Sequence, residues 1–118
     1  MSYPKHEDDR GIFQELARLE DIGHPIHQVS FFTINSGKSR GKHYHKLLME
    51  TFVILEGSCN VSVCNTQDDS RYSLPLVEGD CYSCFPGEQH EFYSEKGCKI
   101  LVLASNEFSK ENPDVYSV

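Results

Sequence analysis

Apolar and polar residues alternate in short runs along most of the chain, and turn-forming residues separate these runs. The clearest run, residues 28–34, is rich in β-branched and aromatic side chains and stops at Asn35-Ser36-Gly37. Alternation with a period of two places neighbouring side chains on opposite faces of a strand. The pattern therefore predicts strands here and in six further segments: 51–55, 59–63, 71–74, 81–85, 91–93 and 99–103.

Two places decide how these strands are connected. Gly57-Ser58 separates residues 51–55 from residues 59–63 and suits a two-residue II′ turn, which predicts a hairpin. Residues 12–20 fit a short helix and a strand equally well. At least seven short strands and at most one helix predict an all-β domain spanning residues 1–118. Because so small a chain must protect its sheet edges, a jelly-roll sandwich or barrel is expected.

Composition and charge exclude several classes of function. A net charge of -7 and a pI near 5.2 argue against a protein that binds nucleic acid or an anionic membrane. The longest apolar runs are far shorter than a membrane span, and the polar N-terminal segment predicts no secretory signal, so a cytoplasmic location is expected. The five cysteines are then expected to be reduced, with Cys81 and Cys84 as small buried side chains.

One segment carries candidate metal ligands. Residues two apart project from the same face of a strand, so His43 and His45 can reach one ion together. Glu50 follows at an odd offset and can join them only if residues 46–49 form a turn and Glu50 begins the next strand. A carboxylate heading an inward apolar row needs a partner, which a cation supplies.

His90 is the fourth candidate ligand, because the Pro86-Gly87 corner lets the chain re-enter the domain with a side chain aimed inward. Three imidazoles and one carboxylate favour a divalent Zn, Fe, Ni, Mn or Cu ion over Ca or Mg, which prefer oxygen ligands. A His-x-His pair alone also fits two exposed histidines on a strand edge. The joint spacing of the four residues is what favours a metal site.

This spacing resembles the two motifs of the cupin superfamily. The first motif is matched by Gly41, His43, His45, Glu50 and Gly57, and the second by Gly79, Pro86, Gly87 and His90. A closer resemblance, in segments 8–13, 28–34, 39–45 and 112–116, is to the C-terminal cupin domain of the bifunctional reductase/epimerase of capsular-polysaccharide synthesis. Sugar 3,4-ketoisomerases are similar at Asp9-Arg10-Gly11 and Arg40-Gly41-x-His43.

The resemblance implies a double-stranded β-helix, a zinc ion held by His43, His45, Glu50 and His90, and a nucleotide-linked 4-keto-6-deoxy sugar as substrate. A separate reductase is an implied partner. The expected function is a metal-dependent epimerase or isomerase. The alternatives are an Fe-dependent small-molecule dioxygenase and a non-catalytic, sugar-binding accessory domain.

Three further expectations concern chemistry and assembly. Epimerisation beside a ketone needs an acid and a base, for which Tyr82 and Tyr93 are candidates. Arg40 is the candidate for the substrate phosphate, because a guanidinium fork fits phosphate oxygens. The apolar end of the tail, residues 112–118, predicts a homodimer.

Overall fold

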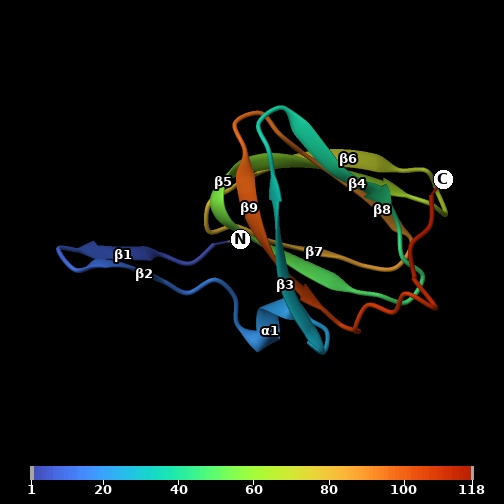
Figure 1. Ribbon diagram of the computed structural model, residues 1–118, viewed down its shortest axis with the longest axis horizontal. Coiled ribbons are helices and arrows are strands. Elements are labelled where there is room, and N and C mark those ends of the chain that lie inside the picture. The colour runs from blue at the N-terminus through green and yellow to red at the C-terminus, as the bar shows by residue number, and fades with distance from the viewer. Residues whose placement is uncertain (1, 118) are drawn as a thin grey trace.

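The computed structural model describes residues 2–117 as an antiparallel sheet of seven strands that curls until its two halves face each other (Figure 1). This architecture confirms the predicted all-β class. The strands of the curled sheet are β3 (Gln28–Ile34), β4 (Lys38–His43), β5 (Glu50–Asn65), β6 (Arg71–Val77), β7 (Cys81–Cys84), β8 (Glu88–Ser94) and β9 (Cys98–Ala104). A separate hairpin pairs β1 (Lys5–Asp8) with β2 (Gly11–Gln14), and α1 (Leu19–Ile22) follows it.

β5 runs through both halves of the sheet, which corrects the predicted hairpin at Gly57-Ser58. Its first part pairs with β9 and β7, and its second part pairs with β8 and β6. Gly57 has a positive φ of 79°, and a Cβ there would lie 2.3 Å from the carbonyl oxygen of Gly97. The glycine therefore serves a bend beside a bulge in one long strand, and not the reversal that its local sequence suggests.

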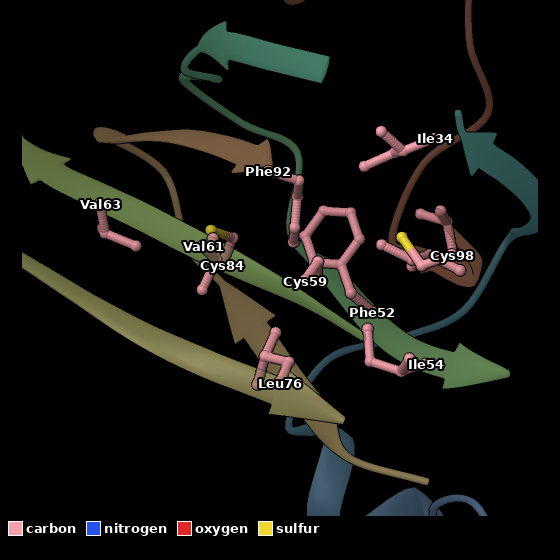
Figure 2. Packing of buried hydrophobic residues seen from close by; sticks show 12 residues of the cluster. Ile34, Phe52, Ile54, Cys59, Val61, Val63, Leu76, Cys84, Phe92 and Cys98 are labelled. Atoms are coloured by element: carbon pink, nitrogen blue, oxygen red, sulfur yellow. The ribbon is translucent and has the colours of Figure 1, made fainter. Parts of the chain in front are cut away.

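The core lies between the two halves of the sheet (Figure 2). Phe52 and Ile54 point inward from the first part of β5, whereas Val61 and Val63 point inward from the second part. The inward positions change from even to odd because the bulge between Ile54 and Glu56 shifts the register. β9 alternates strictly between buried and half-buried side chains, as expected for a strand with one face on the core.

Residues 12–20 form neither one helix nor one strand. Their first part belongs to β2, and α1 begins at Leu19 and ends before Gly23, which takes the left-handed conformation common after helices. The β1–β2 hairpin projects from the body of the domain (Figure 1). Its side chains at Ile12 and Phe13 are 56% and 68% exposed.

Two expectations from composition can be compared with the structure. The five cysteines are free, and Cys84 is buried in the core as predicted, whereas Cys81 is only half-buried and stays outside the core cluster. Across residues 2–117, no helix reaches the length and hydropathy that a membrane span requires. Met1 and Val118, the ends of the predicted domain and tail, lie outside the described residues.

Candidate metal centre and substrate cavity

His43 and His45 are brought together at the end of β4 by an irregularity in the strand. β4 pairs regularly with β8 as far as Gly41, and a bulge then precedes the pairing of His43 with His90. Gly41 has a φ of +101°, and a Cβ there would lie 2.7 Å from the carbonyl oxygen of His90. Because only glycine allows this approach, Gly41 lets β4 place His43 against β8. The rings of His43 and His45 lie 5.0 Å apart between centroids.

Glu50 begins β5 after a non-strand segment at residues 46–49, which is the arrangement that the odd offset predicts. Its Oε1 lies 2.9 Å from Nε2 of His45 and 3.7 Å from Nε2 of His90. Phe52 and Ile54 follow Glu50 on the inward face of the strand and are buried. Glu50 is therefore the first, polar member of an otherwise apolar inward row.

His90 is the most deeply placed histidine of the group, at 2% exposure. The Pro86-Gly87 corner precedes it, as predicted, and the Gly87 N–H donates to the carbonyl oxygen of His45 at 2.8 Å. That bond ties the turn before His90 to the segment that carries His45. The His90 ring packs against Phe52 and Phe92, at centroid distances of 5.7 and 6.0 Å.

The surroundings keep two of the three imidazoles neutral. Burial lowers the pKa of His90 to about 4, against the partial opposition of the Glu50 charge. Burial and the charge of His45 lower the pKa of His43 as well. For His45, burial acts to lower the pKa, but the hydrogen bonds to Glu50 and to the Asp114 carbonyl outweigh it and raise the pKa overall. Neutral imidazole is the form that binds a metal.

The donor set fits a transition-metal ion. The nearest ring nitrogens of His43, His45 and His90 all lie within 4.8 Å of one another, and Glu50 contacts two of the three rings. Donors around a tetrahedral zinc ion, with bonds of about 2.0–2.1 Å, lie roughly 3.3 Å apart. The three imidazoles therefore lie close to the spacing of one coordination shell, and Glu50 lies beside two of them. Three nitrogen donors and one carboxylate match Zn, Fe or Ni better than Ca or Mg.

These four side chains lie in a cavity of about 770 Å³ between the β3 and β4 edges of the curled sheet. Phe32, Phe52 and Phe92 contribute aromatic surface to it, and Gln28, Ser30 and Asn106 contribute polar groups. An apolar pocket with a few polar groups is typical of small-molecule sites. The four sequence-predicted ligands therefore share one pocket of substrate size.

Residues 106–116, here called the C-terminal strap, form one wall of this cavity. The strap folds back on its own chain, because Tyr116 and Tyr44 exchange two backbone hydrogen bonds of 3.0 Å each. Asp114 anchors it beside His45, where its carboxylate accepts from the backbone N–H groups of residues 46–48. No role for Asp114 was expected from the sequence, because only its long-range contacts distinguish it from a surface aspartate.

Arg40 lines the cavity, as a phosphate-binding residue must. Its Nε donates to the carbonyl oxygen of Thr33 at 2.8 Å, and its guanidinium lies 5.7 Å from the centroid of the Phe32 ring. These contacts fix the direction of the side chain and use one of its five N–H donors, so the outer nitrogens stay available to a ligand.

Tyr82 and Tyr93, the candidates for acid and base, do not line the cavity that holds the four candidate ligands. The Tyr82 hydroxyl is 2.6 Å from the Tyr72 hydroxyl, and its ring packs on the core. This pair joins β7 to β6 on the side of the sheet away from the β3 and β4 edges. Tyr93 is 43% exposed on β8, where it follows the inward-facing Phe92. Residue type alone suggested both tyrosines, and neither side chain is among those that line the cavity.

The chain is similar in sequence to enzymes that act on nucleotide-linked sugars. The family model described as "Polysaccharide biosynthesis C-terminal domain" matches residues 6–116. A UDP-2-acetamido-2,6-beta-L-arabino-hexul-4-ose reductase of Pseudomonas aeruginosa is 30% identical over 97% of this chain and 31% of its own length. A TDP-4-oxo-6-deoxy-alpha-D-glucose-3,4-oxoisomerase of Aneurinibacillus thermoaerophilus is 27% identical over 93% of this chain and 80% of its own length.

Solved structures share the fold. A double mutant of the QdtA 3,4-ketoisomerase of Thermoanaerobacterium thermosaccharolyticum, in complex with TDP, superimposes with a TM-score of 0.79 at 25% identity, over 99% of this chain and 84% of that one. The capsular polysaccharide assembling protein CapF of Staphylococcus aureus gives 0.73 at 20% identity, over 98% and 34%. These neighbours are cupins, which confirms the expected resemblance. The chain spans about a third of the length of the reductase and of CapF.

Proposed function

Since the chain belongs to the polysaccharide biosynthesis C-terminal domain family, we propose that it is an epimerase or isomerase of a nucleotide-linked 4-keto-6-deoxy sugar. The observation that carries this proposal is the meeting of His43, His45, His90 and Glu50 in a cavity large enough for a sugar. Relatives that act on such sugars include a 3,4-oxoisomerase that matches over most of its own length.

In this proposal, His43, His45, Glu50 and His90 hold one divalent metal ion, with zinc as the first choice. When bound, the ion supplies a Lewis acid for the keto oxygen, which lowers the cost of removing a proton from the neighbouring carbon. The buried environment of His90 favours the neutral ligand form and limits the access of water to that side of the site.

The chain's own residues divide the remaining tasks. Arg40 binds the diphosphate through its free guanidinium nitrogens, and Phe32 and Thr33 hold it in place. Two carboxylates outside the ligand set line the cavity, on Glu107 and Asp114. The Asp114 carboxylate is occupied by three backbone N–H donors, which leaves Glu107 as the proton acceptor for the sugar C–H.

The test is exchange of a ring C–H for solvent deuterium. Epimerisation and keto migration both pass through an enediolate, so a UDP- or dTDP-linked 4-keto-6-deoxy sugar incubated in D₂O should gain mass before product analysis is needed. Glu50→Gln should slow this exchange more than it weakens nucleotide binding. His6→Ala, a change at an exposed histidine in β1, is the matched control and should leave both unchanged.

Two other outcomes would replace the proposal. Tight binding of the keto sugars with no mass shift supports a non-catalytic accessory domain. Oxygen consumption in the iron-loaded protein supports a dioxygenase. The reductase of Pseudomonas aeruginosa matches this chain over 31% of its own length. A reductase that consumes the isomerised keto sugar is therefore part of the proposal.

We also propose a homodimer. The basis is the set of exposed apolar side chains on the β1–β2 hairpin and on β3, and not the apolar C-terminal residues. The β1–β2 hairpin exposes Ile12 and Phe13, and β3 ends the sheet with Val29 and Phe31 exposed at 61% and 64%. An isolated two-stranded hairpin is marginal in water, and an open apolar edge strand favours pairing. A second copy of the chain whose β1–β2 hairpin packs on β3 would cover the exposed apolar residues of both elements. Sedimentation should give a dimer for the wild type and a shift toward monomer for Phe31→Glu. Glu91→Gln, on β8, is the control.

A further inference from the structure

We propose that Asp114 is a positioning residue for the candidate metal centre: it fixes the ring of His45 and couples the docking of the C-terminal strap to metal binding. This inference rests on the proposed function, because it concerns the same metal centre. It adds a residue 69 positions away from His45 in the chain, on a segment that also lines the cavity.

The first half of the argument is the contact between the Asp114 backbone and His45. The Nδ1–H of His45 donates to the main-chain carbonyl oxygen of Asp114. With Nδ1 engaged, the other ring nitrogen, Nε2, points at Glu50, whose Oε1 lies 2.9 Å away. Histidine ligands commonly use one nitrogen for the metal and hold the other in such a bond, which fixes the tautomer and the ring orientation. The strap thus decides which nitrogen of His45 faces the cavity.

The second half is the contact between the Asp114 side chain and the segment after His45. Its carboxylate accepts from the N–H groups of Lys46 at 2.9 Å and of Leu47 and Leu48 at 2.8 Å each. These three donors lower the pKa of Asp114 against the opposing effect of partial burial, so the group is a carboxylate at neutral pH. Asp114 therefore holds both the His45 imidazole and the turn that connects His45 to Glu50.

Neighbouring contacts keep Asp114 in this position. Tyr116 pairs with Tyr44, the residue between the two histidines, and the Lys46 ammonium lies 4.2 Å from the centroid of the Tyr116 ring. On the cavity side, the strap contributes Phe108, Asn112 and Val115 to the wall. A strap that leaves its place would remove a wall of the substrate cavity and release His45 at the same time.

The coupling must be reciprocal. If strap docking raises metal affinity by a given factor, metal binding stabilises strap docking by the same factor. The backbone N–H groups of Lys46, Leu47 and Leu48 report on docking directly, because the Asp114 carboxylate accepts from them. Their hydrogen exchange should therefore slow when zinc is added to the full chain.

The experiment compares zinc affinity in Asp114→Ala, Asp114→Asn and the matched control Asp68→Ala. Asp68 also holds its loop through hydrogen bonds, to the N–H and hydroxyl of Ser70, but it does not line the cavity. Loss of Asp114 should weaken zinc binding roughly 10- to 100-fold, the effect usual for residues that orient metal ligands. Asp114→Asn keeps one acceptor oxygen, so its zinc affinity should lie between those of the wild type and Asp114→Ala. Asp68→Ala should bind zinc as tightly as the wild type does. Wild-type affinity in Asp114→Ala would overturn the inference.

A second measurement separates this inference from the metal proposal itself. If the wild type binds no zinc, the proposed metal centre fails, but the His45 contact can still be read in the metal-free chain by long-range ¹H–¹⁵N NMR. A slowly exchanging Nδ1–H on His45 that disappears in Asp114→Ala supports the positioning role. The same signal in both proteins overturns it. Should Asp114→Ala fail to fold, Asp114→Asn and the zinc-dependent exchange of the Lys46–Leu48 amides decide the question.

Discussion

Nε2 of His45 lies 2.9 Å from Oε1 of Glu50, although Glu50 comes five positions after His45 and a regular strand would place the two on opposite faces. The non-strand segment at residues 46–49 resets the register, and Asp114 holds that segment in place. The shape of the candidate metal centre therefore depends on a turn that is stabilised from the far end of the chain.

Metal content is the most direct prediction. Protein purified without chelators should carry about one divalent transition metal per chain, and zinc is expected. His45→Ala should lose the metal, because it removes a buried ligand that contacts Glu50. His6→Ala should retain it, since His6 is exposed on β1. Elemental analysis checks both variants, and wild-type protein without metal would contradict the prediction.

Arg40 should control nucleotide affinity. Arg40→Ala removes the guanidinium from the cavity wall and should weaken UDP or dTDP binding about 10-fold, which corresponds to roughly 1.4 kcal/mol. Arg40→Lys keeps the charge but not the fork and should recover only part of the loss. Lys38→Ala is the matched control, because Lys38 is exposed on the same strand and does not line the cavity. Calorimetric titration with equal losses for Arg40→Ala and Lys38→Ala would show a general charge effect instead.

Glu107 should affect proton transfer and not binding. Glu107→Gln removes the proton acceptor and should slow deuterium exchange into the keto sugar by roughly 100-fold or more, with nucleotide affinity unchanged. Glu111→Gln is the natural comparison, since it changes another exposed carboxylate of the strap that does not line the cavity. Mass spectrometry in D₂O measures both, and normal exchange in Glu107→Gln would assign the base elsewhere.

The metal-free protein should lose stability when it is acidified, mainly through His90. Burial holds the pKa of His90 near 4 against 6.5 for an unperturbed imidazole, so its contribution is full above 6.5 and is lost as the pH falls toward 4. Between pH 7.5 and 4.5 the loss should be about 2 to 3 kcal/mol. The raised pKa of His45 acts in the opposite sense. Its contribution to folding stability is full below pH 6.5 and is lost as the pH rises through the pKa that His45 has in the folded protein.

Urea unfolding of chelator-treated protein across this pH range provides the measurement. In His90→Gln the free energy of unfolding should fall less steeply as the pH falls, because the variant has no buried group to protonate at that position. Its stability at pH 7.5 is expected to be lower than that of the wild type, so the comparison is of slopes with pH. An equal slope in the two proteins would assign the acid sensitivity to other groups.

The sequence predicted most strands and the four clustered side chains because both depend on local spacing. Alternation identifies strands, and His-x-His, a register break before Glu50 and a Pro-Gly corner before His90 place side chains on one face. The hairpin at Gly57 was wrong because a bend in one strand and a tight turn use the same glycine. Tyr82 and Asp114 could not be assigned because their roles depend on partners outside their own segments.

β5 has a mechanical consequence for the metal centre. Glu50 begins the part of this strand that pairs with β9 and β7, whereas His90 pairs with Val63 in the part beyond Gly57. The 3.7 Å between Oε1 of Glu50 and Nε2 of His90 therefore joins the two halves of the sheet across the bend that β5 makes at Gly57. A substitution that changes this bend, at a position outside the cavity, would change the distance between two of the candidate ligands.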